Sequence, residues 1–506
     1  MFNYKYLLQV FCFGIILVVQ KTMQNTTLCT FPPGFKFGTA TSAYQIEGAW
    51  NVSGKTPSIW DFATHNNFES IIDRSNGDIA CDSYNQIDVD IANLQLLNVS
   101  FYRFSISWTR LLPNAGNNFI NPDGVRYYNE VIDKLIAHNI DPMVTIFHWD
   151  LPQSLQDLGG WTNKLTIEYY LQFARTCFSL FGDRVKTWIT FNEISMYCVS
   201  AYDKKSLAPF ASLSGIGTYL CAHYMLLAHG RAYRIYKKDF IHQKGIVGLS
   251  IDSPWYFPAT NTANDKMAAM RAIITGFDWL AHPIFSQTGD YPLFMRKRID
   301  YNSKQQGFKE SRLPRFTTKE KAILQGSADF LGLNHYTSKL ASMPMSEKAS
   351  EMTSYEIDRS FDISFDPKWP KSARNHFKVV PQGLRKLLLY IRDTYNNPIV
   401  YITENGYAGD HSEYIDDHDR VSYTNLYLTE ILKAIVIDKC NVTKYTSWSF
   451  MDNFEWHDGY TLRFGMFHVD FNDPKRKRTP KKSMYAYRNI IRFGTLPRCL
   501  SFEKSI

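Results

Sequence analysis

The sequence predicts an α/β fold, a single (β/α)8 TIM barrel with long loops at its catalytic face. Two observations support this prediction. Eight short apolar runs, typical of buried strands, follow one another along the 506 residues, and amphipathic stretches with a helical period separate most of them. Alternating strands and helices form parallel strands joined by right-handed crossovers, and eight such units favour a closed barrel over an open sheet.

The expected strands are short and rich in β-branched and aromatic residues. In chain order they are Phe35–Thr41, Phe101–Ser107, Pro142–His148, Thr187–Asn192, Gly245–Ile251, Phe330–Tyr336, Ile399–Thr403 and Tyr445–Phe450. The helical stretches between them include Tyr127–His138, Ile167–Phe181, Tyr219–Lys238 and Leu426–Ile437. An open doubly wound sheet usually has a glycine-rich phosphate loop after its first strand, and the segment from Gly38 to Thr41 is not one.

The N-terminus predicts a signal peptide over about residues 1–22, which leaves residues 23–506 for one barrel domain. Lys5 precedes an apolar run from Leu7 to Val19, which is too short to span a bilayer. A signal anchor is the less favoured reading. Four N-x-S/T sequons also favour secretion; they are at Asn25, Asn51, Asn98 and Asn441. We therefore expect a secreted, extracellular glycoprotein without membrane association once the signal is removed.

Composition and cysteine spacing exclude several functional classes. The formal charge is +8, but for the basic run Lys475–Arg478 a solvated loop is favoured over a nucleic-acid site in a secreted chain. Apart from Cys12 in the predicted signal, seven of the eight cysteines remain. They lack the C-x-x-C spacing of a zinc site, so no metal is expected, and an odd number leaves at least one unpaired, buried thiol.

Two glutamates stand at the ends of predicted strands. Glu193 follows Thr187–Asn192, and Glu404 follows Ile399–Thr403 before an Asn-Gly turn. In a barrel the carboxyl ends of all strands meet at the catalytic face. A glycosidase needs two carboxylates there, one as acid and one as nucleophile or base. A glutamate at a strand end is also often part of a structural ion pair, so neither segment is decisive alone.

Further polar and aromatic residues gather at the same predicted strand ends. Taken singly, His148 or Trp448 is more often a core residue than a ligand of substrate. Convergence from most of the strands favours a site. From the first strand to the eighth these residues are Gln45, Arg103, His148, Trp149, Asn192, Asn334, Tyr336, Trp448, Glu455 and Trp456.

Several ordered motifs resemble those of glycoside hydrolase family 1, the β-glucosidase and myrosinase barrels. The resemblance runs from about Phe31 to Pro497, and with its signal peptide and sequons the chain is similar to secreted insect members. The motifs are FGTATSAYQ at 37–45, YRFSISW at 102–108, FHWDLP at 147–152, TWITFNE at 187–193, YITENG at 401–406 and WSFMDNFEW at 448–456.

The resemblance implies a retaining double displacement, with Glu193 as general acid/base and Glu404 as nucleophile. It also places Arg103 and the Tyr336 hydroxyl against Glu404, where a cation and a hydrogen bond keep that carboxylate ionised. Glu193, without such a partner, is expected to keep its proton near neutral pH and later to activate water. Two carboxylates and water complete this chemistry, so no cofactor is implied.

The resemblance also assigns substrate-binding residues. Trp369, in the long segment Thr337–Arg374, resembles the family's aglycone-stacking tryptophan. Members that take phosphorylated sugars have serine and lysine near Glu455, and this chain has neither, so the expected glycone is glucose. The residues expected to bind the glycone are Gln45, His148, Asn192, Trp448, Glu455 and Trp456, and the further substrate-binding residues are Trp149, Asn334, Tyr336 and Phe464.

Three departures from the family pattern lie around the expected mouth of the site. Ile194 follows the acid/base where most members have proline, Leu462 replaces a usual glutamate, and Gln382 stands where tryptophan is common in insect members. These residues affect the expected aglycone preference more than the chemistry.

Three functions are therefore compatible with the sequence. The favoured one is a secreted retaining β-glycosidase acting on terminal β-D-glucosides with small aglycones. The second is a thioglucosidase (myrosinase) acting on glucosinolates. Lys204 and Lys205 follow the acid/base closely in sequence and are candidates to approach the sulfate of a glucosinolate, although solvated surface lysines are the favoured interpretation. Plant myrosinases have glutamine at the acid position, whereas Glu193 is retained here. The third, an inactive carbohydrate-binding relative, is disfavoured because both glutamates are present. The expected partner is a small-molecule glucoside; the oligomeric state stays open, with a homodimer as one option.

Overall fold

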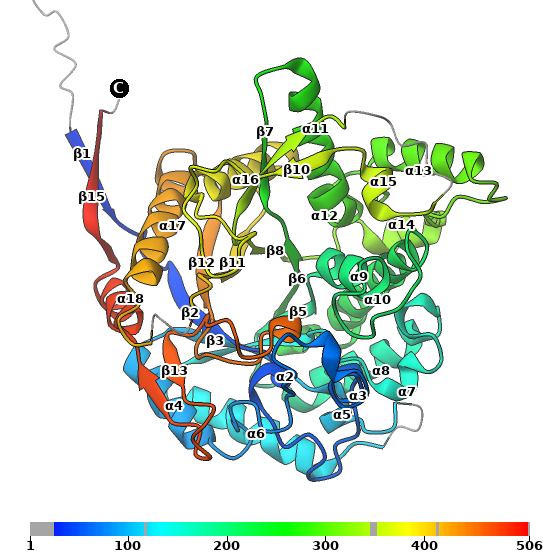
Figure 1. Cartoon of the computed structure of the whole chain (residues 1–506). Coiled ribbons are helices and arrows are strands. Elements are labelled where there is room, and N and C mark those ends of the chain that lie inside the picture. Colours follow the sequence, from blue (N-terminus) through cyan, green and yellow to red (C-terminus); the bar gives the residue numbers. More distant parts are fainter. Residues whose placement is uncertain (1–24, 116–118, 345–351, 411–413, 504–506) are drawn as a thin grey trace, which may run out of the picture.

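A closed barrel of eight parallel strands forms the centre of the protein (Figure 1). The structure is a computed structural model that describes residues 25–115, 119–344, 352–410 and 414–503. Around the barrel the strands are β2 (Lys36–Ala40), β3 (Phe101–Ser105), β4 (Asp141–Phe147), β5 (Thr187–Asn192), β6 (Ile246–Asp252), β8 (Phe330–Asn334), β11 (Val400–Asn405) and β12 (Val442–Trp448). β12 pairs with β2 and closes the ring. The predicted TIM barrel is confirmed, with all eight strands in the predicted order.

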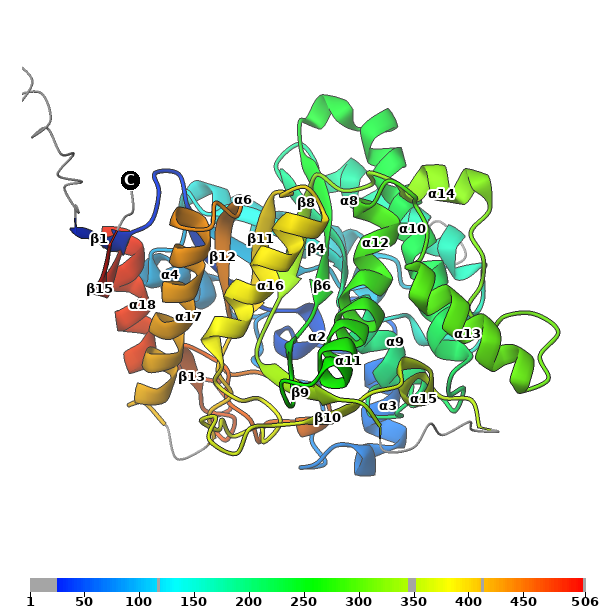
Figure 2. The ribbon, with the colours of Figure 1, turned by 90° about the horizontal axis from the view of Figure 1, so that it is seen from above.

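Helices surround this barrel in Figures 1 and 2. The longer ones are α4 (Ile87–Leu97), α6 (Pro122–Ala137), α8 (Thr166–Phe181), α10 (Gly217–Asp239), α11 (Ala263–Ile273), α13 (Leu293–Gln305), α16 (Pro381–Thr394), α17 (His418–Val436) and α18 (Lys482–Phe493). Shorter helices are α2 (Ala43–Ile46), α3 (Ile59–Asn66), α5 (Trp108–Leu111), α7 (Gln153–Gln156), α9 (Ile194–Tyr202), α12 (Trp279–Phe285), α14 (Thr318–Leu324) and α15 (Tyr355–Arg359).

α6 illustrates how local sequence forms this outer layer. Asn121 caps its N-terminus, with its side chain accepting a hydrogen bond from the backbone N–H of Asp123, and proline occupies the first helical position. Tyr128, Ile132 and Leu135 are buried at helical spacing. One face of the helix therefore packs against the barrel while the other meets solvent.

An apolar cluster fills the barrel at the amino ends of its strands. Phe101, Met143, Ile189, Phe330 and Tyr401 are all buried in it, and the rings of the last two stack at 4.3 Å. Such a filled interior leaves the opposite, carboxyl-end face as the place for a substrate site.

Additional strands lie outside the barrel. β7 (Trp255–Pro258), β9 (Ser338–Ser342) and β10 (Asp362–Ser364) form a small sheet, and β13 (Phe467–Val469) pairs with β14 (Arg478–Pro480). β1 (Asn25–Thr30) pairs with β15 (Thr495–Glu503), so the two ends of the described chain lie side by side in Figures 1 and 2. The loops with β10, β13 and α15 gather on one side of the barrel in Figure 2.

The basic run near the C-terminus is only partly the solvated loop that the sequence favours, since Lys475 and Lys477 are exposed but Arg478 is not. Arg478 is buried and donates to Asp90 at 2.9 Å, and the buried Lys481 ammonium lies 2.7 Å from Asp452. Arg476 donates to the backbone oxygen of Ala80 at 3.0 Å. Arg478 and Lys481 neutralise buried carboxylates, which is a structural role that sequence runs of charge do not reveal.

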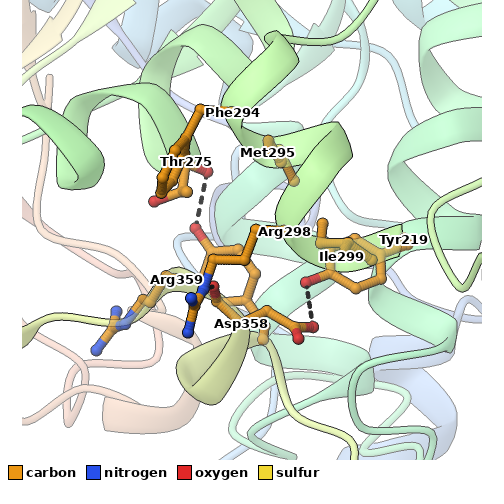
Figure 3. Close-up of a pocket in the computed structure, with 9 residues that line it drawn as sticks. Tyr219, Thr275, Phe294, Met295, Arg298, Ile299, Asp358 and Arg359 are labelled. Carbon is orange, nitrogen blue, oxygen red and sulfur yellow. Dashed lines mark hydrogen bonds between the residues drawn. The ribbon is translucent and has the colours of Figure 1, made fainter. Parts of the chain in front are cut away.

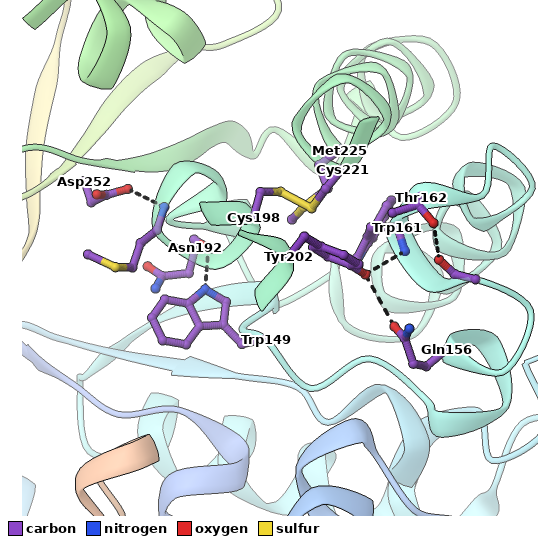
Figure 4. Close-up of a disulfide and its surroundings, with 12 residues drawn as sticks. Trp149, Gln156, Trp161, Thr162, Asn192, Cys198, Tyr202, Cys221, Met225 and Asp252 are labelled. Atoms are coloured by element: carbon purple, nitrogen blue, oxygen red, sulfur yellow. Dashed lines mark hydrogen bonds between the residues drawn. A yellow bond between two sulfur atoms is a disulfide. The ribbon is translucent and has the colours of Figure 1, made fainter. Parts of the chain in front are cut away.

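The cysteines divide into bridged and free residues. Cys198 on α9 and Cys221 on α10 form a disulfide (Figure 4), and Cys29 is also disulfide-bonded. Cys81, Cys177 and Cys440 are free and buried. The predicted unpaired, buried thiol is therefore confirmed.

The features that predict secretion are only partly within the described residues. Residues 1–22 lie outside them. Asn51 and Asn98 are exposed, and Asn441 is half-buried; the side chain of Asn25 is not described. Within the described ranges, no helix has both the length and the apolar character needed to span a bilayer.

Candidate active site

The two glutamates predicted as catalytic lie at the carboxyl ends of two barrel strands, with β6 and β8 between them. Glu404 is on β11 and Glu193 follows β5 directly. Both are buried, with 3% and 6% of their surface exposed. The charge of Glu404 acts on the ionisation of Glu193 and raises its pKa, which burial raises most. The barrel therefore brings together two carboxylates that are 211 positions apart in sequence, from 193 to 404.

Glu404 is held by two strong donors. Arg103 Nη1 lies 2.6 Å from one carboxylate oxygen, and the Tyr336 hydroxyl donates to the other at 2.6 Å. Charge-assisted bonds of this length are about twice as strong as neutral ones. The structure thus places both predicted partners directly on the expected nucleophile.

The Arg103 guanidinium is itself fixed by its surroundings. Its Nε donates to the Thr145 hydroxyl at 3.1 Å, and Nη1 also donates to the backbone oxygen of Thr403 at 2.9 Å. Nη2 donates to Asn192 Oδ1 at 2.7 Å. Because all three guanidinium nitrogens donate hydrogen bonds, the Arg103 cation is held beside Glu404.

Glu193 does have a hydrogen-bond partner, contrary to the expectation from sequence. Asn334 Nδ2 donates to its Oε1 at 2.7 Å. The Asn334 carbonyl oxygen accepts from the Thr403 hydroxyl at 2.7 Å, which orients the amide. A neutral amide donor stabilises a carboxylate less than the Arg103 cation does, so the environments of the two glutamates remain unequal.

This inequality separates the pKa values of the two carboxyls. Burial raises the pKa of both. For Glu404, the Arg103 charge and the hydrogen bonds from Tyr336 and Arg103 oppose that rise. For Glu193, the charges of Glu404 and Asp252 add to it. Glu193 therefore keeps its proton to a higher pH than Glu404 does.

A polar group on the other side of the site joins the first and eighth barrel strands. Gln45 Nε2 donates to Asn453 Oδ1 at 2.9 Å and lies 3.4 Å from Glu455 Oε2. Its carbonyl oxygen accepts from the Ser42 hydroxyl at 2.7 Å. Burial raises the pKa of Glu455 to about 7, and the Arg374 cation opposes this rise. These side chains are pre-oriented hydrogen-bonding groups, suited to a polyhydroxylated ligand.

An aromatic wall stands beside these polar groups. The His148 ring lies 5.8 Å from Trp448 and 6.0 Å from Trp456, nearly parallel to both. Trp149 packs on Trp456 at 4.9 Å, and its indole N–H donates to the backbone oxygen of Asn192 at 3.0 Å. Asn192 and His148 are themselves 3.1 Å apart. Flat apolar faces next to hydrogen-bonding groups are typical of carbohydrate sites.

Arg374 is a component of the site that sequence reasoning missed. Its Nη1 lies 3.5 Å from Glu455 Oε1, and its Nη2 pairs with Asp458. The guanidinium also lies 5.1 Å from the Phe377 ring and 5.9 Å from the Phe464 ring. No motif or period marks this loop residue, and only the tertiary fold brings it to Glu455.

The other predicted residues fall into two groups. Phe464 is buried and packs 6.1 Å from Tyr336, and Leu462 joins the same apolar cluster with Trp448. Trp369 is half-buried, and its ring lies 6.1 Å from Phe257; among the described contacts none joins it to either carboxylate. The structure thus brings the glycone residues together, and the assignment of Trp369 to the aglycone stays a prediction.

A small cavity near α13 and α15 is not a second substrate site (Figure 3). Its volume is about 10 Å³, room for about one water molecule. Beside it the Tyr219 hydroxyl donates to Asp358 at 2.6 Å and the Tyr355 hydroxyl donates to the backbone oxygen of Thr275 at 3.0 Å. These bonds anchor the long loop after β8 to the helices.

Comparisons with known proteins agree with this geometry. The family model described as glycosyl hydrolase family 1 matches residues 27–495. Myrosinase 1 of Brevicoryne brassicae is 44% identical over 92% of this chain and 99% of its own length. A cytosolic beta-glucosidase of Homo sapiens is 44% identical over 91% and 98% of the two chains.

Solved structures give the same result. An aphid myrosinase superimposes with a TM-score of 0.88 at 44% identity, covering 92% of this chain and 99% of that one. A rice beta-glucosidase does so with a TM-score of 0.86 at 38% identity, covering 91% and 99%. With a matching family model, a shared barrel and two carboxylates at its carboxyl-end face, the chain belongs to glycosyl hydrolase family 1 and is a glycoside hydrolase.

Proposed function

We propose that this protein is a secreted retaining β-glycosidase that hydrolyses terminal β-D-glucosides with small aglycones. The observation that carries this proposal is the unequal treatment of two buried glutamates. Glu404 meets a cation and a phenol, both at 2.6 Å, whereas Glu193 meets one neutral amide. One carboxylate is thereby prepared to attack and the other to deliver a proton.

The reaction has two steps. In the first, a Glu404 oxygen forms a bond to the anomeric carbon while the glycosidic bond breaks, and the leaving oxygen takes the proton of Glu193. In the second, the Glu193 carboxylate takes a proton from water, whose oxygen bonds to the anomeric carbon and releases Glu404. Retention of configuration requires the two carboxyl groups to be about 5–5.5 Å apart.

The glycone is held by the residues opposite the carboxylates. Contacts within the protein orient the side chains of Gln45 and Glu455 before substrate arrives. An epimer with a misplaced hydroxyl therefore leaves a buried polar group unpaired. Trp448 offers a flat face for the sugar ring. His148, Asn192 and Trp456 complete the set, which carries no cation suited to a sugar phosphate except Arg374, and Arg374 is already paired with two carboxylates.

Secretion is part of the proposal, with residues 1–22 as its signal and the remainder as one barrel domain. The Cys198–Cys221 disulfide supports it because such bonds persist in oxidising compartments. Exposed sequons at Asn51 and Asn98 are in keeping with glycosylation. Relatives include proteins named cytosolic beta-glucosidases, so the location needs a direct test: the chain with its own N-terminus, expressed in insect cells, is expected in the medium and to lose mass on deglycosylation.

A second candidate function is thioglucoside hydrolysis. Burial and the neighbouring charges of Lys204 and Arg359 lower the pKa of Lys339 to about 8. The Lys339 cation opposes the rise that burial causes in the pKa of Asp252. The Asp252 charge in turn raises the pKa of Glu193. These three cations are suited to an anionic aglycone such as the sulfate of a glucosinolate, although Glu356 partly neutralises Lys204 at 3.1 Å and Arg359 at 3.7 Å.

One panel of substrates separates the two candidates. Purified protein is assayed on cellobiose, an aryl β-glucoside, an aryl β-galactoside and a glucosinolate, with NMR of the first-formed sugar anomer. We expect aryl β-glucoside turnover with β-glucose as first product. Turnover of glucosinolate with poor turnover of O-glucosides selects the second candidate. A Glu404→Gln variant that keeps full activity refutes the mechanism for both.

A further inference from the structure

Asp252 lies at the carboxyl end of β6, beside the helix that follows the expected acid/base. Its Oδ1 accepts a hydrogen bond from the Ser195 hydroxyl at 2.6 Å and another from the backbone N–H of Met196 at 3.3 Å. Both donors belong to the first turn of α9, which begins directly after Glu193. Figure 4 shows the Asp252 carboxylate directed at this turn.

The backbone at Glu193 needs such support. Its φ is +49°, in the left-handed region that residues with a Cβ adopt at a cost. Its N–H donates to the backbone oxygen of Ser250 on β6 at 2.9 Å. Further along, the Cys198–Cys221 disulfide ties α9 to α10. Strand β6 therefore fixes the acid/base from the backbone side and, through Asp252, from the helix side.

The charges around Glu193 come from several strands. After burial, the Glu404 charge raises the pKa of Glu193 most, and the Arg103 cation, 2.6 Å from Glu404, opposes this rise only in part. The Asp252 charge raises the pKa of Glu193 further. The groups facing Glu193 are Glu404 on β11, Arg103 on β3, Asp252 on β6, and Asn334 and Tyr336 on and after β8.

The surroundings stabilise a negative charge on Asp252 more than on Glu193. It receives two hydrogen bonds, and the Lys339 cation faces it. Glu193 receives one bond from an amide and faces the negative Glu404. Burial raises the pKa of both carboxyls. As the pH rises, Asp252 ionises before Glu193, because more donors and a cation stabilise its anion.

We propose that Asp252 is a positioning residue for the acid/base: its carboxylate charge keeps the proton on Glu193, and its hydrogen bonds hold the first turn of α9 that aims Glu193. The inference rests on the proposed function, in which Glu193 delivers a proton to the leaving group. It adds a residue to that machinery which touches neither substrate nor the reacting atoms.

The test is the pH dependence of kcat/KM for 4-nitrophenyl β-D-glucoside, whose basic limb reports the acid/base of the free enzyme. Asp252→Asn keeps an oxygen that accepts from Ser195 but removes the charge. We expect the basic limb to move down by about 0.5–1 pH unit. Ser195→Ala removes the shorter hydrogen bond and keeps the charge, so its limb stays in place or moves up while kcat falls several-fold. Asp239→Asn, which alters a surface pair with Arg175, is the matched control and leaves the profile unchanged.

Two results overturn the inference: an unmoved limb in a folded Asp252→Asn variant, or an equal downward shift in Ser195→Ala, which assigns the shift to displacement of the helix. If Asp252→Asn does not fold, Lys339→Met replaces it. Removing the cation that faces Asp252 is expected to move the limb up, and a downward shift contradicts the proposal. Glu193→Gln separates failure of the proposed function from failure of the inference about Asp252. If this variant retains wild-type activity and the wild-type basic limb, the proposed function itself fails, whatever the result for Asp252.

Discussion

Replacing Arg374 by methionine tests whether this unforeseen residue sustains the glycone side of the site. The substitution keeps an unbranched apolar stem on the rings of Phe377 and Phe464 and removes the cation beside Glu455. The pKa of Glu455 is already raised to about 7 by burial, and Arg374 is the first influence that opposes the rise. Without Arg374 the pKa of Glu455 therefore moves further up.

The magnitude follows from linkage. A carboxyl with a folded-state pKa above its unfolded value favours the folded state fully at low pH and loses that advantage as pH rises through the folded pKa. Each unit added to the Glu455 pKa costs about 1.4 kcal/mol above pH 8 and almost nothing at pH 5, where the group is protonated in either protein. In a protein of this size that is about 1–2 °C in Tm. At neutral pH, loss of the charged acceptor also raises KM about tenfold.

Differential scanning calorimetry at pH 5 and pH 8 measures the first effect, and KM for an aryl β-glucoside between pH 5.5 and 7.5 measures the second. Arg385→Met is the control, because it likewise removes a partly buried cation, but one on α16 that pairs with Asp438 at 2.6 Å instead of with Glu455. Equal destabilisation of Arg374→Met at both pH values, with KM unchanged, refutes the reasoning.

Three further predictions concern the carboxylates and the glycone. Tyr336→Phe removes a 2.6 Å bond to Glu404 and should lower kcat/KM about 10- to 100-fold while moving its acid limb up by about one pH unit; a fall in kcat/KM with an unmoved limb contradicts this. Glu193→Gln should reduce kcat on alkyl glucosides about 10²–10⁴-fold but spare 2,4-dinitrophenyl glucoside, whose leaving group needs no proton; an equal loss on both leaving groups argues against Glu193 as the acid. Gln45→Leu should raise KM for glucosides about tenfold or more with a smaller effect on kcat, and a pure kcat defect argues for misfolding at Ser42 and Asn453 instead.

The barrel and its central pair were accessible from sequence because both depend on local pattern. The strand that ends in Glu404 is a short β-branched run closed by an Asn-Gly turn, and the period of α6 follows its buried Tyr128, Ile132 and Leu135. Once eight such strands close, the place of their last residues is set by topology. The contacts of Arg103 and Tyr336 with Glu404 were accessible only through family resemblance, since nothing local specifies them.

Other parts of the structure depend on partners far away in sequence. Arg374 meets Glu455 and Asp458 across more than 80 positions, and its own loop has no distinguishing pattern. Arg478 belongs to the basic run expected to be a solvated loop, but the fold buries it against Asp90. Charge in a sequence identifies the need for a partner, whereas only the fold decides between solvent and a buried carboxylate.

The aromatic and aliphatic side chains that fill the amino end of the barrel have a consequence for product formation. With Phe101, Phe330 and Tyr401 closing that end, a departing aglycone and the incoming water must use the same mouth. In the proposed mechanism, an alcohol bound in this mouth competes with water for the glycosyl group on Glu404. At high concentrations of glucoside or short alcohols, we therefore expect new glycosides to be made alongside free glucose. Hydrolysis and glycoside synthesis then compete because water and alcohol enter through the same mouth.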